Sequence, residues 1–235
     1  MKSKKIYLLA LVLSQFLMGC IRTYYPAIYQ TSSYPMIYNQ ADSTRKIVKY
    51  LSADLTISNG NYHGESIQLF KCNYVMANTN DYYNNNLRVF GYAGNYRVQG
   101  LDEYNGNKTA FGLGGEFSTS MNVKIYSLKI GIGINAGIAC EIGCYYNFRK
   151  KIGNSESKLV FGTFSAFPVI SYNLSKSSVL SAQTNIGVPG LLSPTIVLNN
   201  NNYIYWLSWV SNYQDRESIF GNRLVLGFMI NINNL

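Results

Sequence analysis

Hydrophobic residues alternate with small or polar residues between positions 124 and 147 for longer than anywhere else in the chain. The apolar set is Tyr126, Leu128, Ile130, Ile132, Ile134, Ala136, Ile138, Cys140, Ile142, Cys144 and Tyr146. The intervening set is Ser127, Lys129, Gly131, Gly133, Asn135, Gly137, Glu141 and Gly143. A period of two residues predicts an extended strand with one apolar face and one small or polar face. Glycine is poor in strands and suits a wall that curves tightly or has little room inside, so the pattern favours a barrel with its apolar face outward.

The same alternation recurs along most of the chain, interrupted by clusters of asparagine, glycine and serine. It is found at residues 50–58, 66–77, 87–98, 108–121, 124–147, 158–173, 178–191 and 223–233. Two places leave the strand number open, because a tight turn at residues 135–137 would divide the longest segment and residues 203–210 could form another strand. The alternation keeps its phase through Asn135, which favours an undivided strand there. The pattern therefore predicts an all-β, antiparallel, up-and-down transmembrane barrel of eight strands, or of ten.

The amino-acid composition agrees with a wall that faces lipid. Charged residues make up 13% of the chain and aromatic residues 14%, with 21 tyrosines, and this balance favours a lipid-facing surface over a water-facing one. The formal net charge is +9. The basic residues are scattered apart from Arg149, Lys150 and Lys151, which argues against nucleic-acid binding and is compatible with attraction to anionic lipid headgroups.

Six charged residues fall on the faces assigned to the barrel interior: Asp54, Arg97, Glu116, Lys129, Glu141 and Arg223. Residues 87–98 are assigned in the same way as the other strands, with their aromatic residues outward and Arg97 inward. Charges inside a narrow barrel must pair with one another or be hydrated. Because an eight-stranded barrel leaves room only for side chains, we expect a structural ion network that fills a closed interior. The alternative is a conducting or ligand-binding path.

The amino terminus has the three regions of an export signal: a basic start, an apolar run too short to span a bilayer, and a small residue before Cys20. Residues 17–20, Leu-Met-Gly-Cys, resemble the lipobox of bacterial lipoproteins, although Met18 stands where a small residue is usual. The resemblance implies that residues 1–19 are a signal peptide and that the Cys20 thiol is acylated with a fatty acid such as palmitate after cleavage. Ordinary cleavage without acylation is the alternative. Ile21 is not the Asp that retains lipoproteins in the inner membrane, so delivery to the outer membrane of a two-membrane bacterium is implied.

Residues 20–48 show neither a helical nor a strand period, so we interpret them as a lipid anchor at Cys20 followed by an extended tether. Residues 49–235 make up the barrel. From residue 51 onward the pattern resembles small bacterial outer-membrane β-barrel proteins, although Leu235 is not the terminal aromatic residue usual in that class. The resemblance implies insertion by the barrel-insertion machinery, contact with outer-membrane lipids, and a monomer.

The excursion at residues 193–218 is the first place to look for a further partner. With the amino terminus on the periplasmic side, the link between the seventh and eighth strands is extracellular, where the long loops of such barrels lie. Trp206 and Trp209 are three residues apart, so on a strand they point to opposite faces and a single lipid belt cannot bury both. The alternatives are packing on the barrel rim, contact with outer-leaflet headgroups, and contact with an extracellular or envelope protein.

The sequence offers little chemistry for catalysis. His63, the single histidine, is followed by Glu65 and Ser66, a trio that imitates the site of lipid-modifying barrel enzymes, but adjacent loop residues rarely place a base opposite a nucleophile. Cys140 and Cys144 would lie ~13 Å apart along one strand, too far for a disulfide or a shared metal. We therefore expect no catalytic residue, metal or cofactor, and a structural or surface-interaction role in the envelope. The alternatives are a lipid-modifying barrel enzyme and a soluble β-sandwich or lipocalin-like lipoprotein that binds a small ligand.

Overall fold

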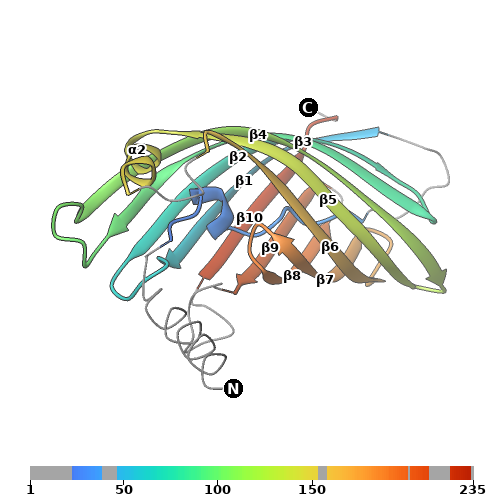
Figure 1. Ribbon diagram of the computed structural model, residues 1–235. Helices are drawn as coiled ribbons and strands as arrows, with labels where there is room; N and C mark the ends of the chain where they lie inside the picture. Colours follow the sequence, from blue (N-terminus) through green and yellow to red (C-terminus); the bar gives the residue numbers. More distant parts are fainter. Residues whose placement is uncertain (1–22, 39–46, 153–157, 201, 212–222, 234–235) are drawn as a thin grey trace, which may run out of the picture.

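The computed structural model describes residues 23–38, 47–152, 158–200, 202–211 and 223–233. In these residues ten antiparallel strands form one closed barrel, in which β1 pairs with both β2 and β10 (Figure 1). The strands are β1 (Ile47–Asn59), β2 (Ser66–Thr79), β3 (Tyr83–Val98), β4 (Gly106–Ile125), β5 (Leu128–Ile142), β6 (Val160–Asn173), β7 (Ser178–Val188), β8 (Leu192–Asn200), β9 (Tyr203–Val210) and β10 (Arg223–Asn231). The all-β barrel is confirmed, with ten strands rather than eight, and its closure excludes the β-sandwich alternative.

Two helices accompany the strands in the described residues, η1 (Ala27–Gln30) and α2 (Cys144–Lys151). Neither is long and apolar enough to cross a membrane.

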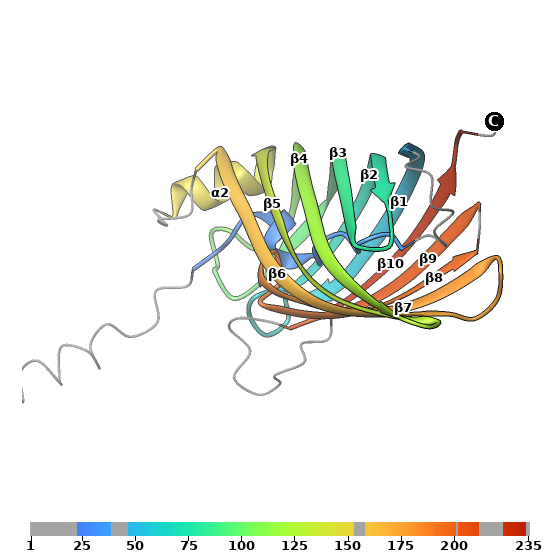
Figure 2. The same ribbon diagram turned by 90° about the vertical axis from the view of Figure 1, so that its right-hand side faces the viewer.

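The two ends of the barrel differ in their connections (Figure 2). At one end, which we call the short-turn end, the strands are joined in pairs by residues 80–82, 126–127, 174–177 and 201–202. At the other, the loop end, they are joined by residues 60–65, 99–105, 143–159, 189–191 and 211–222. The longest of these connections carries α2. Both the start of β1 and the end of β10 lie at the short-turn end, as an even number of antiparallel strands requires.

The longest alternating stretch of the sequence contains one strand, β5, flanked by a turn and a helix. β5 continues without a break through Asn135, so the undivided strand is confirmed. Its large aliphatic side chains are exposed on the outside, while its charged side chains are buried inside. The predicted ends were wrong, because Tyr126 lies in the preceding turn, with a φ of 55°, and α2 begins at Cys144. A few alternating residues at an end do not distinguish a strand from a turn or from the first turn of a helix.

Two strands replace the extracellular excursion predicted at residues 193–218. β8 and β9 pair with each other, with Leu198 opposite Tyr205, and β9 pairs with β10. These two strands bring the number to ten. The run of asparagines suggested a loop, but Asn199 belongs to β8, is 5% exposed, and donates a hydrogen bond from Nδ2 to the Tyr38 carbonyl inside the barrel at 2.8 Å.

β3 is turned the opposite way from the prediction. Tyr92 and Tyr96 point into the barrel and are at most 4% exposed, whereas Arg97 is exposed on the outer surface. The assignment of Arg97 to the interior was therefore wrong. It assumed that large aromatic side chains face lipid, but the interior makes room for them: a Cβ atom added at Gly112 of β4 would collide with the Tyr92 ring.

Residues 23–38 run through the inside of the barrel, and Figure 2 shows them surrounded by the strands. We call them the luminal segment. Its residues Tyr24, Ala27, Thr31, Ser33 and Met36 are all 0% exposed. The structure thus places these residues within the barrel rather than between the barrel and an anchor. A segment that is surrounded on every side has no single buried face, and this explains why its sequence shows no period.

Candidate functional site

The luminal segment contributes to each of the three hydrophobic clusters found in the described residues. The cluster at the loop end contains Tyr24 and Ile28, the second contains Tyr34, and the third contains Met36 and Tyr38. All five side chains are at most 3% exposed. Because the segment completes every cluster, the interior is packed as a protein core.

A buried carboxylate holds the segment at the loop end. Glu65, in the connection between β1 and β2, is 2% exposed. The Tyr24 hydroxyl donates to Glu65 Oε1 at 2.5 Å, and the Tyr96 hydroxyl donates to Glu65 Oε2 at 2.6 Å. The Tyr24 ring also packs edge-on against Phe148 of α2, with 4.9 Å between the ring centroids. Hydrogen bonds to an ionised acceptor are roughly twice as strong as neutral ones, so Glu65 fastens this part of the segment firmly.

A second carboxylate, Glu141 at the end of β5, forms a buried ion pair that the segment completes. Arg149 of α2 donates to Glu141 Oε1 from Nη2 at 2.6 Å and from Nε at 3.2 Å, and both side chains are 0% exposed. The Ala27 N–H donates to Glu141 Oε2 at 2.6 Å. Such N–H groups at the start of a helix have no partner within it. A buried ion pair needs further hydrogen bonds to offset its desolvation, and Ala27 supplies one.

The strands themselves supply an ion pair in the middle of the lumen. Lys71 Nζ of β2 lies 3.1 Å from Asp54 Oδ1 of β1, and both side chains are almost completely buried. Lys71 Nζ also donates to Thr31 Oγ1 of the luminal segment at 3.4 Å. The pair thus faces the luminal segment.

Tyr34 lies between a cation and an indole ring. The Arg88 guanidinium is 4.7 Å from the centroid of the Tyr34 ring, while the Trp206 ring meets Tyr34 edge-on at 5.2 Å. Arg88 Nη2 also lies 3.0 Å from Glu116 Oε2. Gly227 is the register partner of Trp206 on β10, and a Cβ atom added there would collide with the indole. These cation–π and edge-to-face contacts fix Tyr34 against the barrel wall.

Neutral groups hold the segment at the short-turn end. The Met36 N–H donates to Gln183 Oε1 at 2.9 Å. The Tyr38 hydroxyl donates to Asn122 Oδ1 at 3.0 Å, and the Tyr38 carbonyl accepts from Asn199 Nδ2 at 2.8 Å. Contacts of the segment therefore extend from the loop end to the short-turn end.

Five of the six charges assigned to the interior from sequence lie inside the barrel, each at most 5% exposed: Asp54, Glu116, Lys129, Glu141 and Arg223. Lys129 Nζ is 3.2 Å from Asp81 Oδ1, and Arg223 Nη2 donates to Asn61 Oδ1 at 3.2 Å. Arg97 is the exception described above. Asp54 and Glu116 belong to one cluster, because Asn73 donates to Asp54 Oδ2 and accepts from Arg88, which pairs with Glu116. The other three have their own partners elsewhere along the lumen.

Sequence reasoning missed three cations that complete these pairs: Lys71, Arg88 and Arg149. The signal for Lys71 was available, because it alternates with outward Phe70. Arg88 shares a face with the aromatic residues of β3 and was missed when that strand was inverted. Arg149 stands in a basic stretch between two predicted strands, and its position in α2 brings it to Glu141.

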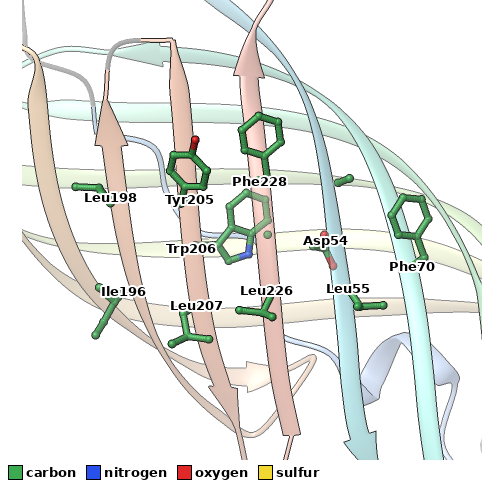
Figure 3. Close-up of a pocket in the computed structure, with 12 residues that line it drawn as sticks. Asp54, Leu55, Phe70, Ile196, Leu198, Tyr205, Trp206, Leu207, Leu226 and Phe228 are labelled. Carbon is green, nitrogen blue, oxygen red and sulfur yellow. The ribbon is translucent and has the colours of Figure 1, made fainter.

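The two tryptophans have different environments. Trp206 is 4% exposed and contacts the luminal segment, so its assignment as a surface contact was wrong, whereas Trp209 is 43% exposed on the outer wall. Figure 3 shows the outer wall beside Trp206, where outward side chains that include Tyr205, Leu226 and Phe228 line a shallow apolar groove. An apolar groove of this kind on the outer wall suits lipid chains.

His63 and Glu65 are not arranged as a catalytic site. His63 is exposed, whereas the Glu65 carboxylate is buried and accepts hydrogen bonds from two tyrosines. Ser66 begins β2 and is half-buried. In the part of the chain that the structure describes, no group of histidine, cysteine, aspartate and glutamate residues is placed to hold a metal ion. Cys20, the predicted lipidation site, lies outside the described residues.

No protein-family model matches the sequence, and no curated protein sequence matches it. Several solved structures resemble the barrel. The outer membrane protein OprG from Pseudomonas aeruginosa is 10% identical, with a TM-score of 0.36 over 80% of this chain and 96% of that one. An outer membrane channel from Pseudomonas putida F1 is 8% identical, with a TM-score of 0.42 over 83% of this chain and 100% of that one. Neisserial surface protein A is 12% identical, with a TM-score of 0.30 over 77% and 96% of the two chains. At these levels the likeness concerns the barrel architecture alone.

Proposed function

We propose that this protein is a monomeric outer-membrane barrel whose own amino-terminal chain keeps the lumen closed, with a structural or surface-interaction role in the bacterial envelope. The observation that carries the proposal is the luminal segment. It is buried, it completes every described hydrophobic cluster, and it bonds to the wall from Glu65 near one end to Asn122 near the other. Opening a path would require breaking these contacts.

The outer wall supports placement in a membrane. Leu113, Ile132 and Phe164, on three successive strands, are 66%, 70% and 58% exposed. Apolar surface on this scale is not left in water by soluble monomers, whereas a lipid-facing band outside a polar lumen is the arrangement of transmembrane barrels. A lipocalin-like protein has the opposite distribution, because its apolar face lines an internal ligand site.

Alkaline carbonate extraction tests this placement. The Cys20→Ala variant lacks the proposed acyl anchor, so retention in the membrane pellet depends on the barrel wall alone. We expect it to remain in the pellet. Release of this variant into the supernatant would favour a soluble lipoprotein held only by its lipid.

Planar-bilayer recording tests the closed lumen. The wild-type protein is expected to show no stable conductance, and a variant in which residues 23–38 are deleted is expected to conduct. Glu116→Gln changes a buried luminal charge, and Glu103→Gln changes an exposed one of the same type. A stable wild-type conductance that Glu116→Gln alters and Glu103→Gln does not would contradict the proposal.

The proposed role is non-enzymatic. It is supported by the hydrogen bonds from Tyr24 and Tyr96 to Glu65, which occupy this carboxylate so that it does not act as the acidic partner of His63. Incubation of the purified protein with outer-membrane lipids is expected to release no fatty acid. Release that disappears in His63→Ala would instead establish a lipid-modifying enzyme.

Trp209 is the residue that we propose to meet the lipid interface. It lies one position from the end of β9 at the loop end and is partly exposed on the outer wall. Tryptophan is enriched where the apolar band meets the headgroups, because its ring is apolar and its N–H is polar.

A further inference from the structure

The direction of the luminal segment is fixed by its contacts. Tyr24 bonds to Glu65 in the loop-end connection between β1 and β2, and the Tyr145 hydroxyl in α2 donates to the Tyr25 carbonyl at 3.0 Å. Tyr38 bonds to Asn122, near the turn that joins β4 to β5 at the short-turn end. The chain therefore runs from the loop end at residue 23 to the short-turn end at residue 38, and then returns as β1.

Transmembrane barrels of bacteria have short turns on the periplasmic side and longer loops outside the cell. The connections of this barrel divide in that way, with two to four residues in each link at one end and α2 in the longest link at the other. The start of β1 then faces the periplasm, but residue 23 faces the cell surface. On this orientation the strands start on the periplasmic side, as expected from sequence, whereas the luminal segment starts on the opposite side.

We infer that the mature chain begins at the cell surface, with Cys20 and any acyl group on its thiol in or above the outer leaflet. This inference rests on the proposed outer-membrane barrel. Cys20 is three positions before Thr23, and three extended residue steps span at most about 10 Å. Such a length cannot reach the periplasmic side, because the lumen is filled by the segment and the wall is closed by the pairing of β1 with β10.

The rim around this position suits a lipid surface. Lys150 and Lys151 of α2 lie at the loop end, and both are exposed. Ammonium groups beside a membrane attract anionic headgroup phosphates. Acyl chains at Cys20 would insert next to the apolar outer wall, so the lipid would hold the loop end of the barrel to the outer leaflet.

Epitope accessibility on intact cells tests the inference. One epitope is inserted after Arg22, and matched copies are placed after Asp102 in a loop-end connection and after Lys176 in a short turn, both of which are exposed. Antibody is expected to bind the copies at 22 and 102 on intact cells, and the copy at 176 only after permeabilisation. An epitope at 22 that needs permeabilisation, while the copy at 102 does not, would overturn the inference. Binding to 176 but not to 102 would also overturn it, because the barrel would then be inverted.

The position of the lipid is tested separately with a clickable palmitate analogue. Label is expected on the wild type and absent from Cys20→Ala. A protease site placed within the epitope at 22 should separate the label from the barrel when intact cells are treated, leaving an unlabelled barrel band. Label that stays on the barrel under these conditions would place Cys20 inside the cell envelope and contradict the inference. A wild-type conductance with a surface-exposed epitope would overturn the closed-lumen function and leave this inference standing.

Discussion

The two ends of the lumen hold one segment by different chemistry. At the loop end, Tyr24 and the Ala27 N–H donate to buried carboxylates, Glu65 and Glu141. At the short-turn end, Tyr38 meets side-chain amides. Because charge-assisted hydrogen bonds are the stronger class, the segment is held more firmly at the loop end than at the short-turn end. The difference indicates that any loosening of the segment begins at the short-turn end.

Removal of the Glu141 carboxylate should have the largest effect. Glu141→Ala leaves the buried Arg149 guanidinium without its carboxylate and the Ala27 N–H without its acceptor. Breaking one side of a buried ion pair costs about 3–5 kcal/mol. Urea unfolding in detergent micelles, followed by circular dichroism, measures the loss. Glu103→Ala, an exposed glutamate in a loop, is the control, and similar unfolding curves for the two variants would contradict the role given to Glu141.

A matched pair of hydroxyl deletions compares the two ends directly. Tyr24→Phe removes a hydrogen bond to a carboxylate, which costs about 1.5–3 kcal/mol. Tyr38→Phe removes a hydrogen bond to the Asn122 amide, which costs about 0.5–1.5 kcal/mol, and a contact with the Ser120 hydroxyl, which keeps its own hydrogen bond to Asn122 Oδ1. Both rings remain in place, so packing changes little. The same unfolding measurement should rank Tyr24→Phe as the more destabilised variant. The opposite ranking would contradict the conclusion that the segment is held more firmly at the loop end.

The smallest effect is expected from pH at the short-turn end. Partial burial acts to raise the pKa of Asp81, but hydrogen bonds and charge from Lys124 and Lys129 outweigh it and hold that pKa below its usual value of 3.8. The ionised form is thus favoured by folding, and its stabilisation is present above pH 3.8 and is lost as pH falls through the lower folded value. Lys124 is 40% exposed and Asp81 33%, so solvent screening keeps the contribution small.

The measurement is the difference in unfolding free energy between the wild type and Asp81→Asn at each pH. The two proteins share all other carboxylates, so the titration of those groups drops out of the difference. The stability difference should be present near neutral pH and shrink as pH falls below 3.8. High salt should reduce it as well. A difference that grows on acidification would have the wrong sign for a depressed pKa.

Alternation predicted the wall well because each strand separates an exposed outer face from the lumen. β5 and Asp54 of β1 follow directly from a period of two, which assigns every second residue to one face. The same rule inverted β3, because period alone does not tell which face is inside when both carry large residues. Tyr92 faces inward only because Gly112 on the next strand leaves space for its ring, and this pairing depends on a register that a single strand does not contain.

The filled lumen could not be predicted in this way. Tyr24, Tyr34 and Tyr38 are contacted from several directions, so no repeat in the sequence marks them as core residues. Their partners come from a turn, from β-strands far apart in the chain, and from a short helix. Glu65 was considered for catalysis and not for packing, because its two tyrosine donors lie 41 and 31 residues away in sequence.

The closure of β1 on β10 has a consequence for the order of assembly. The hydrogen bonds between these strands, with Leu55 opposite Leu226, complete a ring around residues that precede β1 in the same chain. If the barrel closed first, the bulky side chain of Tyr34 would have to pass along the lumen of a closed barrel. The segment must therefore lie along the concave surface of a sheet that is still open, and the seam between the first and last strands must form afterwards. Once the seam has formed, the luminal segment is enclosed by strands of its own chain. It can then leave only if the seam reopens or if each of its packed aromatic side chains passes along the lumen.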